Sequence, residues 1–110
     1  MKQIPVGPKP PKVVYCFVEI PKGDTNKYEY DHKMNTFILD RALYGAVYYP
    51  TEYGYIPQTL SLDGDPLDIM TITSNPTFPG CLISTRVIGV LELEDSGKKD
   101  HKILAVATHD

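Results

Sequence analysis

Three aspartates lie within six residues in the run Asp63-Gly64-Asp65-Pro66-Leu67-Asp68. Asp63 and Asp65 are two residues apart, so in extended backbone their side chains project to the same side. Carboxylates held this close together repel one another unless a cation joins them. Oxygen ligands without His or Cys favour Mg²⁺ or Mn²⁺ over zinc. The run therefore indicates a site for a divalent cation.

The same run also has a plainer interpretation, a solvated acidic turn. Asp-Gly is common in turns because Asp bonds to its own backbone and Gly tolerates left-handed conformations, so the run taken alone favours the turn. A calcium-binding EF-hand loop does not fit the spacing. Counted from Asp63, the sixth position is Asp68 rather than Gly, and the twelfth is Ser74 rather than Glu.

Further charged side chains lie outside this run. Asp95 and Asp100 flank a predicted turn, with Lys102 two residues further on, and alone they are typical of an ordinary hairpin tip. Lys27 and Arg41 are of the types that bind phosphate, because they supply a point charge and a bidentate fork. Taken singly, each of these two side chains is expected to be a surface charge. Their chemistry depends on whether the fold brings them to the acidic run.

The composition limits the classes of protein. The chain has 110 residues, which fits one domain, and its formal net charge is −3. Proteins that bind nucleic acid by neutralising phosphates normally carry a basic balance, so a nucleic-acid partner is not expected. No apolar run is long enough to cross a bilayer, and the amino terminus does not resemble a signal peptide. We therefore expect a cytoplasmic protein with no membrane partner.

The chain is predicted to be mainly β, with no convincing helical period. Residues 1–12, rich in Pro and Lys, form an extended arm, and residues 13–110 form a single core domain. Gly89 suggests a bulge in the longest strand. Cys16 and Cys81 sit among apolar neighbours and are expected to be buried free thiols. Short strands spaced as in a small barrel are predicted at residues 13–20, 27–31, 36–40, 50–57, 69–73, 82–94 and 102–108.

The acidic run resembles the Asp-x-Asp-Pro-φ-Asp-φ motif of the soluble, Mg²⁺-dependent inorganic pyrophosphatases known as family I. Other segments resemble that family in the same order and with similar gaps, so coincidence is excluded in practice. These segments are Glu19-Ile20-Pro21-Lys22-Gly23, Lys27-Tyr28-Glu29, Asp40-Arg41, Tyr49-Pro50, Tyr53-Gly54-Tyr55-Ile56-Pro57, Thr59-Leu60, Gly89-Val90-Leu91 and the spacing Asp95…Asp100-x-Lys102.

The resemblance implies an OB-like five-stranded barrel with additional short strands and the site in its mouth. It implies hydrolysis of pyrophosphate to two phosphates with Mg²⁺ as the cofactor, Mn²⁺ or another divalent ion being an alternative. Asp63, Asp68 and Asp100 are implied to bind the first metal ion, and Asp63 is shared with the second. Asp95 and Glu19 are implied to bind the additional metal ions that arrive with substrate.

The resemblance also assigns the chemistry. Asp65 is implied to be the general base for a water that bridges two metal ions, because two such ions lower the pKa of that water toward neutrality. The residues implied to hold the phosphates are Lys27, Arg41, Tyr53 and Lys102. Glu29 and Tyr49 are implied to support the site.

The chain departs from the family pattern in two respects. Ser96 follows Asp95, where relatives carry an acidic residue, and this affects a supporting contact. The family continues with a helical segment and a Tyr-Lys pair that helps to bind the distal phosphate, whereas this chain ends at Asp110 after a predicted strand. We therefore expect a chain truncated at its C-terminus.

Two alternatives to an efficient enzyme follow. The first is a weakly active or inactive barrel that binds Mg²⁺ and phosphate without efficient turnover. The second, an oligonucleotide-binding OB-like barrel, is disfavoured by the acidic charge. Because relatives form dimers or hexamers, a homo-oligomer is also expected.

Overall fold

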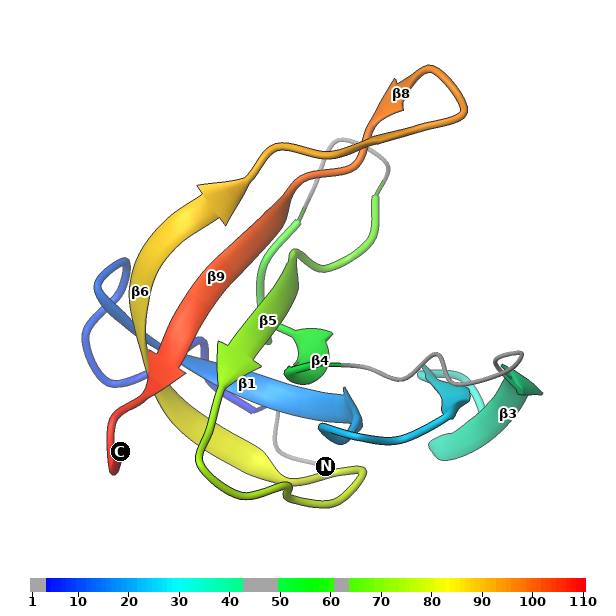
Figure 1. Ribbon diagram of the computed structural model, residues 1–110, viewed down its shortest axis with the longest axis horizontal. Helices are drawn as coiled ribbons and strands as arrows, with labels where there is room; N and C mark the ends of the chain where they lie inside the picture. The colour runs from blue at the N-terminus through cyan, green and yellow to red at the C-terminus, as the bar shows by residue number, and fades with distance from the viewer. Residues whose placement is uncertain (1–3, 43–49, 61–63) are drawn as a thin grey trace.

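The computed structural model describes residues 4–42, 50–60 and 64–110, and in those residues all regular secondary structure is β-strand (Figure 1). No helix capable of spanning a bilayer occurs among them. The strands are β1 (Val13–Ile20), β2 (Asn26–Asp31), β3 (Thr36–Ala42), β4 (Glu52–Tyr55), β5 (Asp68–Ile72), β6 (Leu82–Leu91), β7 (Glu94–Asp95), β8 (Lys98–Lys99) and β9 (Lys102–Ala107).

Five of these strands close into a barrel in the order β1-β4-β5-β9-β6. β1 closes it by pairing antiparallel with both β4 and β6. The contact between β5 and β9 is parallel, and the remaining neighbours in the barrel are antiparallel. The predicted OB-like five-stranded barrel with additional short strands is thus confirmed. The division of the chain at residue 13 into an arm and a core domain stays a prediction.

Two hairpins extend from the barrel in different directions (Figure 1). β2 and β3 form a separate two-stranded sheet whose turn falls at residues 32–35, as the sequence predicts. β7 and β8 form a second short hairpin between β6 and β9. Figure 1 shows β2 and β3 beside the end of β1, so this hairpin can form a wall next to the barrel mouth.

The longest strand carries the bulge that its glycine predicts. The pairing of β6 with β9 shifts between Val87 and Gly89, so β6 carries one residue more than its partner there. Extra residues of this kind bend a strand and increase its twist. β6 can therefore pair with β1 over Leu82–Arg86 and with β9 over Thr85–Leu91.

Apolar side chains from β1, β5, β6 and β9, and from the residue after β4, fill the interior. In β1 the alternation of half-buried and buried residues places Val14, Cys16 and Val18 inside. Ile56, Ile69, Ile83, Ala105 and Ala107 complete this buried cluster. Cys16 is buried and free as predicted, whereas Cys81 is free but only half-buried, because it lies in the loop before β6.

A buried carboxylate joins two of the loops that connect the strands. Glu52 is fully buried, and one of its oxygens, Oε2, accepts the backbone N–H of Lys22 at 2.7 Å. Its Oε1 accepts the backbone N–H of Thr77. Burying a carboxylate is costly unless hydrogen bonds compensate it. Glu52 therefore links the connection after β1 to the connection after β5.

Backbone packing makes one glycine of β4 irreplaceable. A Cβ atom placed on Gly54 would lie 1.9 Å from the carbonyl oxygen of Phe17, in the neighbouring strand β1. A backbone atom within a closed barrel cannot move aside, so we expect Gly54→Ala to destabilise the protein by about 3 kcal/mol or more. Urea unfolding followed by circular dichroism measures the change. Gly89→Ala is the matched control, because a Cβ there meets nothing within 4 Å; equal losses in both variants would contradict this account.

The two thiols should differ in reactivity. Burial raises the pKa of the Cys16 thiol to about 12. The reactive form of a thiol is the thiolate, so Cys16 should be inert in the folded protein at pH 8. In the Cys81→Ser variant, Ellman's reagent should release no colour until denaturant is added and one equivalent afterwards. Rapid reaction of the folded variant would contradict the burial of Cys16.

Candidate active site

A cavity of about 320 Å³ opens where the end of β1, the starts of β5 and β9, and the β2 wall meet. Parallel pairing explains the meeting of the two strand starts, because Ile69 of β5 lies opposite Ile103 of β9. Asp68 and Lys102, one residue earlier in each strand, therefore lie at the same edge. The cavity is lined by Glu19, Ile20, Lys27, Tyr28, Glu29, Tyr30, His32, Tyr53, Tyr55, Asp65, Pro66, Asp68 and Lys102.

Hydrogen bonds fix the backbone that carries Asp65 and Asp68. The backbone N–H of Leu67 donates to the hydroxyl of Thr59 at 2.9 Å, and the backbone N–H of Ile56 donates to the carbonyl of Leu67 at 2.9 Å. Leu67 is thereby held against the end of β4. Both aspartates flank this fixed residue, so their carboxylates reach the cavity from a defined position.

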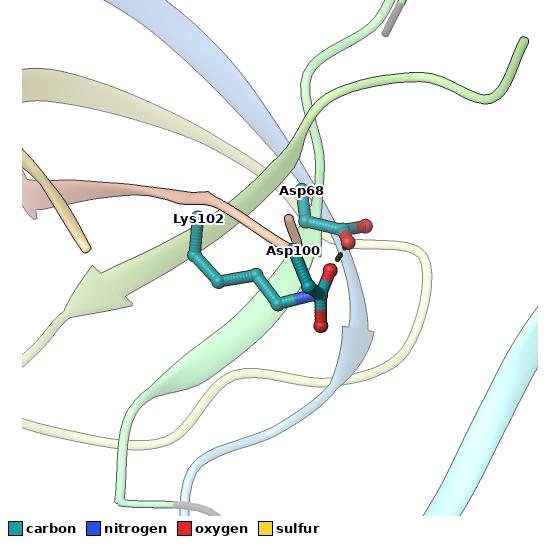
Figure 2. Close-up of polar contacts among 3 residues, drawn as sticks. All are labelled: Asp68, Asp100 and Lys102. Atoms are coloured by element: carbon teal, nitrogen blue, oxygen red, sulfur yellow. Dashed lines mark hydrogen bonds and ion pairs between the residues drawn. The ribbon is translucent and has the colours of Figure 1, made fainter. Parts of the chain in front are cut away.

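Lys102 joins two carboxylates in the site (Figure 2). Its Nζ donates to Oδ2 of Asp68 at 2.6 Å and to Oδ1 of Asp100 at 2.9 Å. Lys102 is only 9% exposed, and its ammonium lies 5.3 Å from the centre of the Tyr53 ring. A buried ammonium needs such partners, because an unpaired charge in the interior is very costly.

The environment keeps this lysine charged. Burial alone lowers the pKa of Lys102, but its hydrogen bonds with Asp68, Tyr53 and Asp100 outweigh that effect, and the net pKa is raised. Burial also raises the pKa of the Tyr53 hydroxyl, which stays protonated. The site therefore presents a permanent positive charge between two carboxylates.

Glu19, at the end of β1, is a carboxyl group in an unusual environment. Burial raises its pKa to about 7, and the carboxylates of Asp68 and Glu29 act in the same direction. The backbone N–H of Tyr30 opposes them by donating to Oε2 of Glu19 at 2.9 Å. A cation in the cavity would offset the repulsion that raises this pKa.

The β2 wall brings a second lysine to the cavity. Lys27 and Glu29 both line it, and Glu29 is exposed. The Nζ of Lys27 lies 3.3 Å from Oδ2 of Asp40, in β3. Arg41 lies opposite Lys27 in the β2–β3 backbone pairing. The side chain of Arg41 falls outside the described part of the chain.

The predicted site residues divide into three groups. Seven line the cavity: Glu19, Lys27, Glu29, Tyr53, Asp65, Asp68 and Lys102. Asp100 joins them through its bond to Lys102. Asp63 and Tyr49 lie outside the described residues. Arg41 and Asp95 are placed only by their backbones, which pair with Lys27 in the β2–β3 hairpin and with Lys98 in the β7–β8 hairpin.

Besides Tyr53, the cavity is lined by ring side chains that were not predicted to take part in the site: Tyr28, Tyr30, His32 and Tyr55. The Tyr30 ring packs edge-on against Phe17 with ring centres 5.3 Å apart, and the His32 ring packs against Tyr55 at 5.4 Å. Burial raises the pKa of Tyr55 to about 12. The alternation in β2 assigns Tyr28 and Tyr30 to the face opposite Lys27, and no sequence signal shows that His32 reaches β4.

The carboxylates suit a hard divalent cation. Asp68 and Asp100 direct one oxygen each at the same cation, the Lys102 ammonium. Carboxylate oxygens favour Mg²⁺ or Mn²⁺. Within residues 4–42, 50–60 and 64–110, no group of three or more His, Cys, Asp or Glu side chains forms a metal-binding cluster by itself. Asp63, implied as the third ligand, lies outside those residues.

Comparison with known proteins assigns the family. The sequence model described as inorganic pyrophosphatase matches residues 16–110. The chain belongs to the family I inorganic pyrophosphatases. It is 56% identical over 100 residues to the inorganic pyrophosphatase of Halalkalibacterium halodurans, a match covering 91% of this chain and 61% of that protein. The Synechocystis inorganic pyrophosphatase is 53% identical over 110 residues, covering 100% of this chain and 64% of the relative.

Solved structures of pyrophosphatases share the barrel. The Thermus thermophilus inorganic pyrophosphatase matches with a TM-score of 0.94 and 46% identity, covering 99% of this chain and 63% of that one. The type I inorganic pyrophosphatase of Toxoplasma gondii matches with a TM-score of 0.83 and 29% identity, covering 97% of this chain and 57% of that one. The chain spans about three fifths of the length of the curated relatives it matches.

The bond between Glu19 and Tyr30 should hold β2 against the barrel. Glu19→Ala removes the acceptor and should lower the free energy of unfolding by about 1–2 kcal/mol, whereas Glu19→Gln keeps an acceptor oxygen and should lose less. Hydrogen exchange of the Tyr30 amide, measured by NMR without metal, should accelerate in the alanine variant. Unchanged exchange there would show that the bond does not hold β2.

Proposed function

We propose that this pyrophosphatase-family chain hydrolyses inorganic pyrophosphate to two phosphates in a reaction that depends on Mg²⁺. The observation that carries the proposal is the arrangement of Asp68, Lys102 and Asp100 at the edge of the cavity that Glu19 and Asp65 also line. A cavity of about 320 Å³ is at the small end of the range for ligand sites, which suits a compact diphosphate.

The charge of the cavity supports a role for metal ions. Four carboxyl residues line it (Glu19, Glu29, Asp65 and Asp68), against two lysines, Lys27 and Lys102. A diphosphate anion would be repelled by this balance unless divalent cations intervene. Asp68 and Asp100, together with Asp63, would hold the first ion, and Asp95 and Glu19 would hold further ions. When bound, Mg²⁺ supplies neutralisation of phosphate charge and lowers the pKa of a bound water.

The chain's own residues position the reactants and move the proton. Asp65, exposed in the cavity, accepts a proton from the attacking water. The oxygen of that water bonds to one phosphorus while the bridging P–O bond breaks and the other phosphate leaves. Phosphoryl transfer asks mainly for such positioning and charge stabilisation. Lys27, Arg41, Tyr53 and Lys102 bind phosphate oxygens, and Glu29 and Tyr49 support these groups.

The proposal also covers the location, the partners and the assembly of the chain. It includes a cytoplasmic location, pyrophosphate and phosphate as ligands, and neither nucleic acid nor membrane as partner. It also includes assembly into a homo-oligomer, a dimer or hexamer. The acidic net charge of −3 supports the exclusion of nucleic acid, and family membership supports the rest.

A phosphate-release assay with and without Mg²⁺ tests the reaction. Asp65→Asn should lower the rate by about a hundredfold to ten-thousandfold, because it removes the proton acceptor. Glu92→Gln is the control, since it also removes one exposed negative charge but does not line the cavity. Absence of phosphate release by the folded chain with excess Mg²⁺ would refute hydrolysis and favour the barrel that binds without turnover.

A further inference from the structure

We propose that the Lys102 ammonium competes with Mg²⁺ for Asp68 and Asp100, so that metal binding displaces Lys102 and frees it to bind a phosphate oxygen. The inference rests on the proposed function for the identity of the anion. It goes beyond that function by making Lys102 a counter-ion of the metal-free site and a link between metal binding and anion binding.

The contacts of Lys102 carry the inference. Its Nζ approaches Oδ2 of Asp68 at 2.6 Å and Oδ1 of Asp100 at 2.9 Å, and Figure 2 shows its side chain reaching to both carboxylates. Lys102 is 9% exposed, so water cannot replace these partners fully. The ammonium thus performs the charge compensation that a bound cation would perform.

Mg²⁺ and the ammonium would compete for Oδ2 of Asp68 and Oδ1 of Asp100. Carboxylates bind Mg²⁺ at about 2.0–2.1 Å. An ammonium kept at hydrogen-bond distance from the same two oxygens would lie next to the dication, where like charges repel strongly in a poorly solvated site. We therefore expect a metal ion bound to these two oxygens to displace the ammonium.

The cavity offers the displaced ammonium a new partner. Lys102 lines the cavity, and its flexible four-carbon stem carries a charge with three donors. In the metal-free site two of these donors are taken by Asp68 and Asp100. After displacement they are available to an anion, so metal binding strengthens anion binding through this lysine. Metal binding then raises the affinity for an anion in two ways, through the charge of the metal ion and through the release of the Lys102 ammonium.

An opposite role for Lys102 makes an opposite prediction. If the ammonium only holds Asp68 and Asp100 in position for the metal, its removal should weaken Mg²⁺ binding. If it competes, its removal should strengthen binding. Magnesium affinity measured without phosphate or pyrophosphate separates the two roles.

Calorimetric titration with MgCl₂ alone is the first experiment. Lys102→Met should raise Mg²⁺ affinity by about tenfold or more, since a neighbouring charge commonly changes ionic equilibria at a carboxylate by a log unit or more. Lys27→Met is the matched control, because Lys27 lines the same cavity but pairs with Asp40. Unchanged or weaker affinity in Lys102→Met, or an equal rise in both variants, would overturn the proposal.

Chemical labelling of the unaltered protein provides a test that needs no variant. Acetylation of lysines followed by mass spectrometry should modify Lys102 slowly without metal and severalfold faster with saturating MgCl₂, while Lys27 serves as the internal reference. Continued protection of Lys102 at saturation would overturn the exchange. Neither experiment contains pyrophosphate, so failure of hydrolysis in the phosphate-release assay is distinguishable from failure of the exchange.

Discussion

The parallel pairing of β5 with β9 is the constraint on which the site depends. Parallel strands begin at the same edge of a sheet, so Asp68 and Lys102 meet although 34 residues separate them. Strand β1 closes the barrel at both sides, and its end brings Glu19 to the same edge. Any change that loosens the barrel, such as a side chain at Gly54, would separate residues that no local contact holds together.

Electrostatic repulsion among carboxylates determines the protonation and ion pairing of the side chains at this edge of the barrel. Glu19 has its pKa raised to about 7 by burial and by neighbouring carboxylates, and Lys102 keeps its charge because Asp68 and Asp100 bind it. A poorly solvated acidic cavity is stable only when a cation compensates it. In the metal-free protein the chain supplies that cation itself. The proposed metal dependence and anion binding would thus arise from the same balance of charge.

Local patterns predicted most of the strands and several details of the fold. The β-branched and aromatic runs located β1, β2, β5, β6 and β9, and the glycine in β6 located its bulge, because side-chain period and turn residues act over short distances. Sequence patterns were less informative about how the β2–β3 hairpin contributes to the cavity. The contact of His32 with Tyr55 depends on where the β2–β3 hairpin lies against the barrel, which is a long-range property. The exposure of Cys81 also depends on loop packing.

The sequence by itself determined the family, because the ordered series of motifs around Asp65 can be recognised without knowing any contact. It also determined which types of residue are available to form a site. Only the tertiary structure decided that Asp68 and Asp100 share one ammonium, since that contact depends on strand order, direction and register. Asp100 is near Lys102 along the chain, but Asp68 lies 34 residues away and only the closed barrel brings it to the lysine.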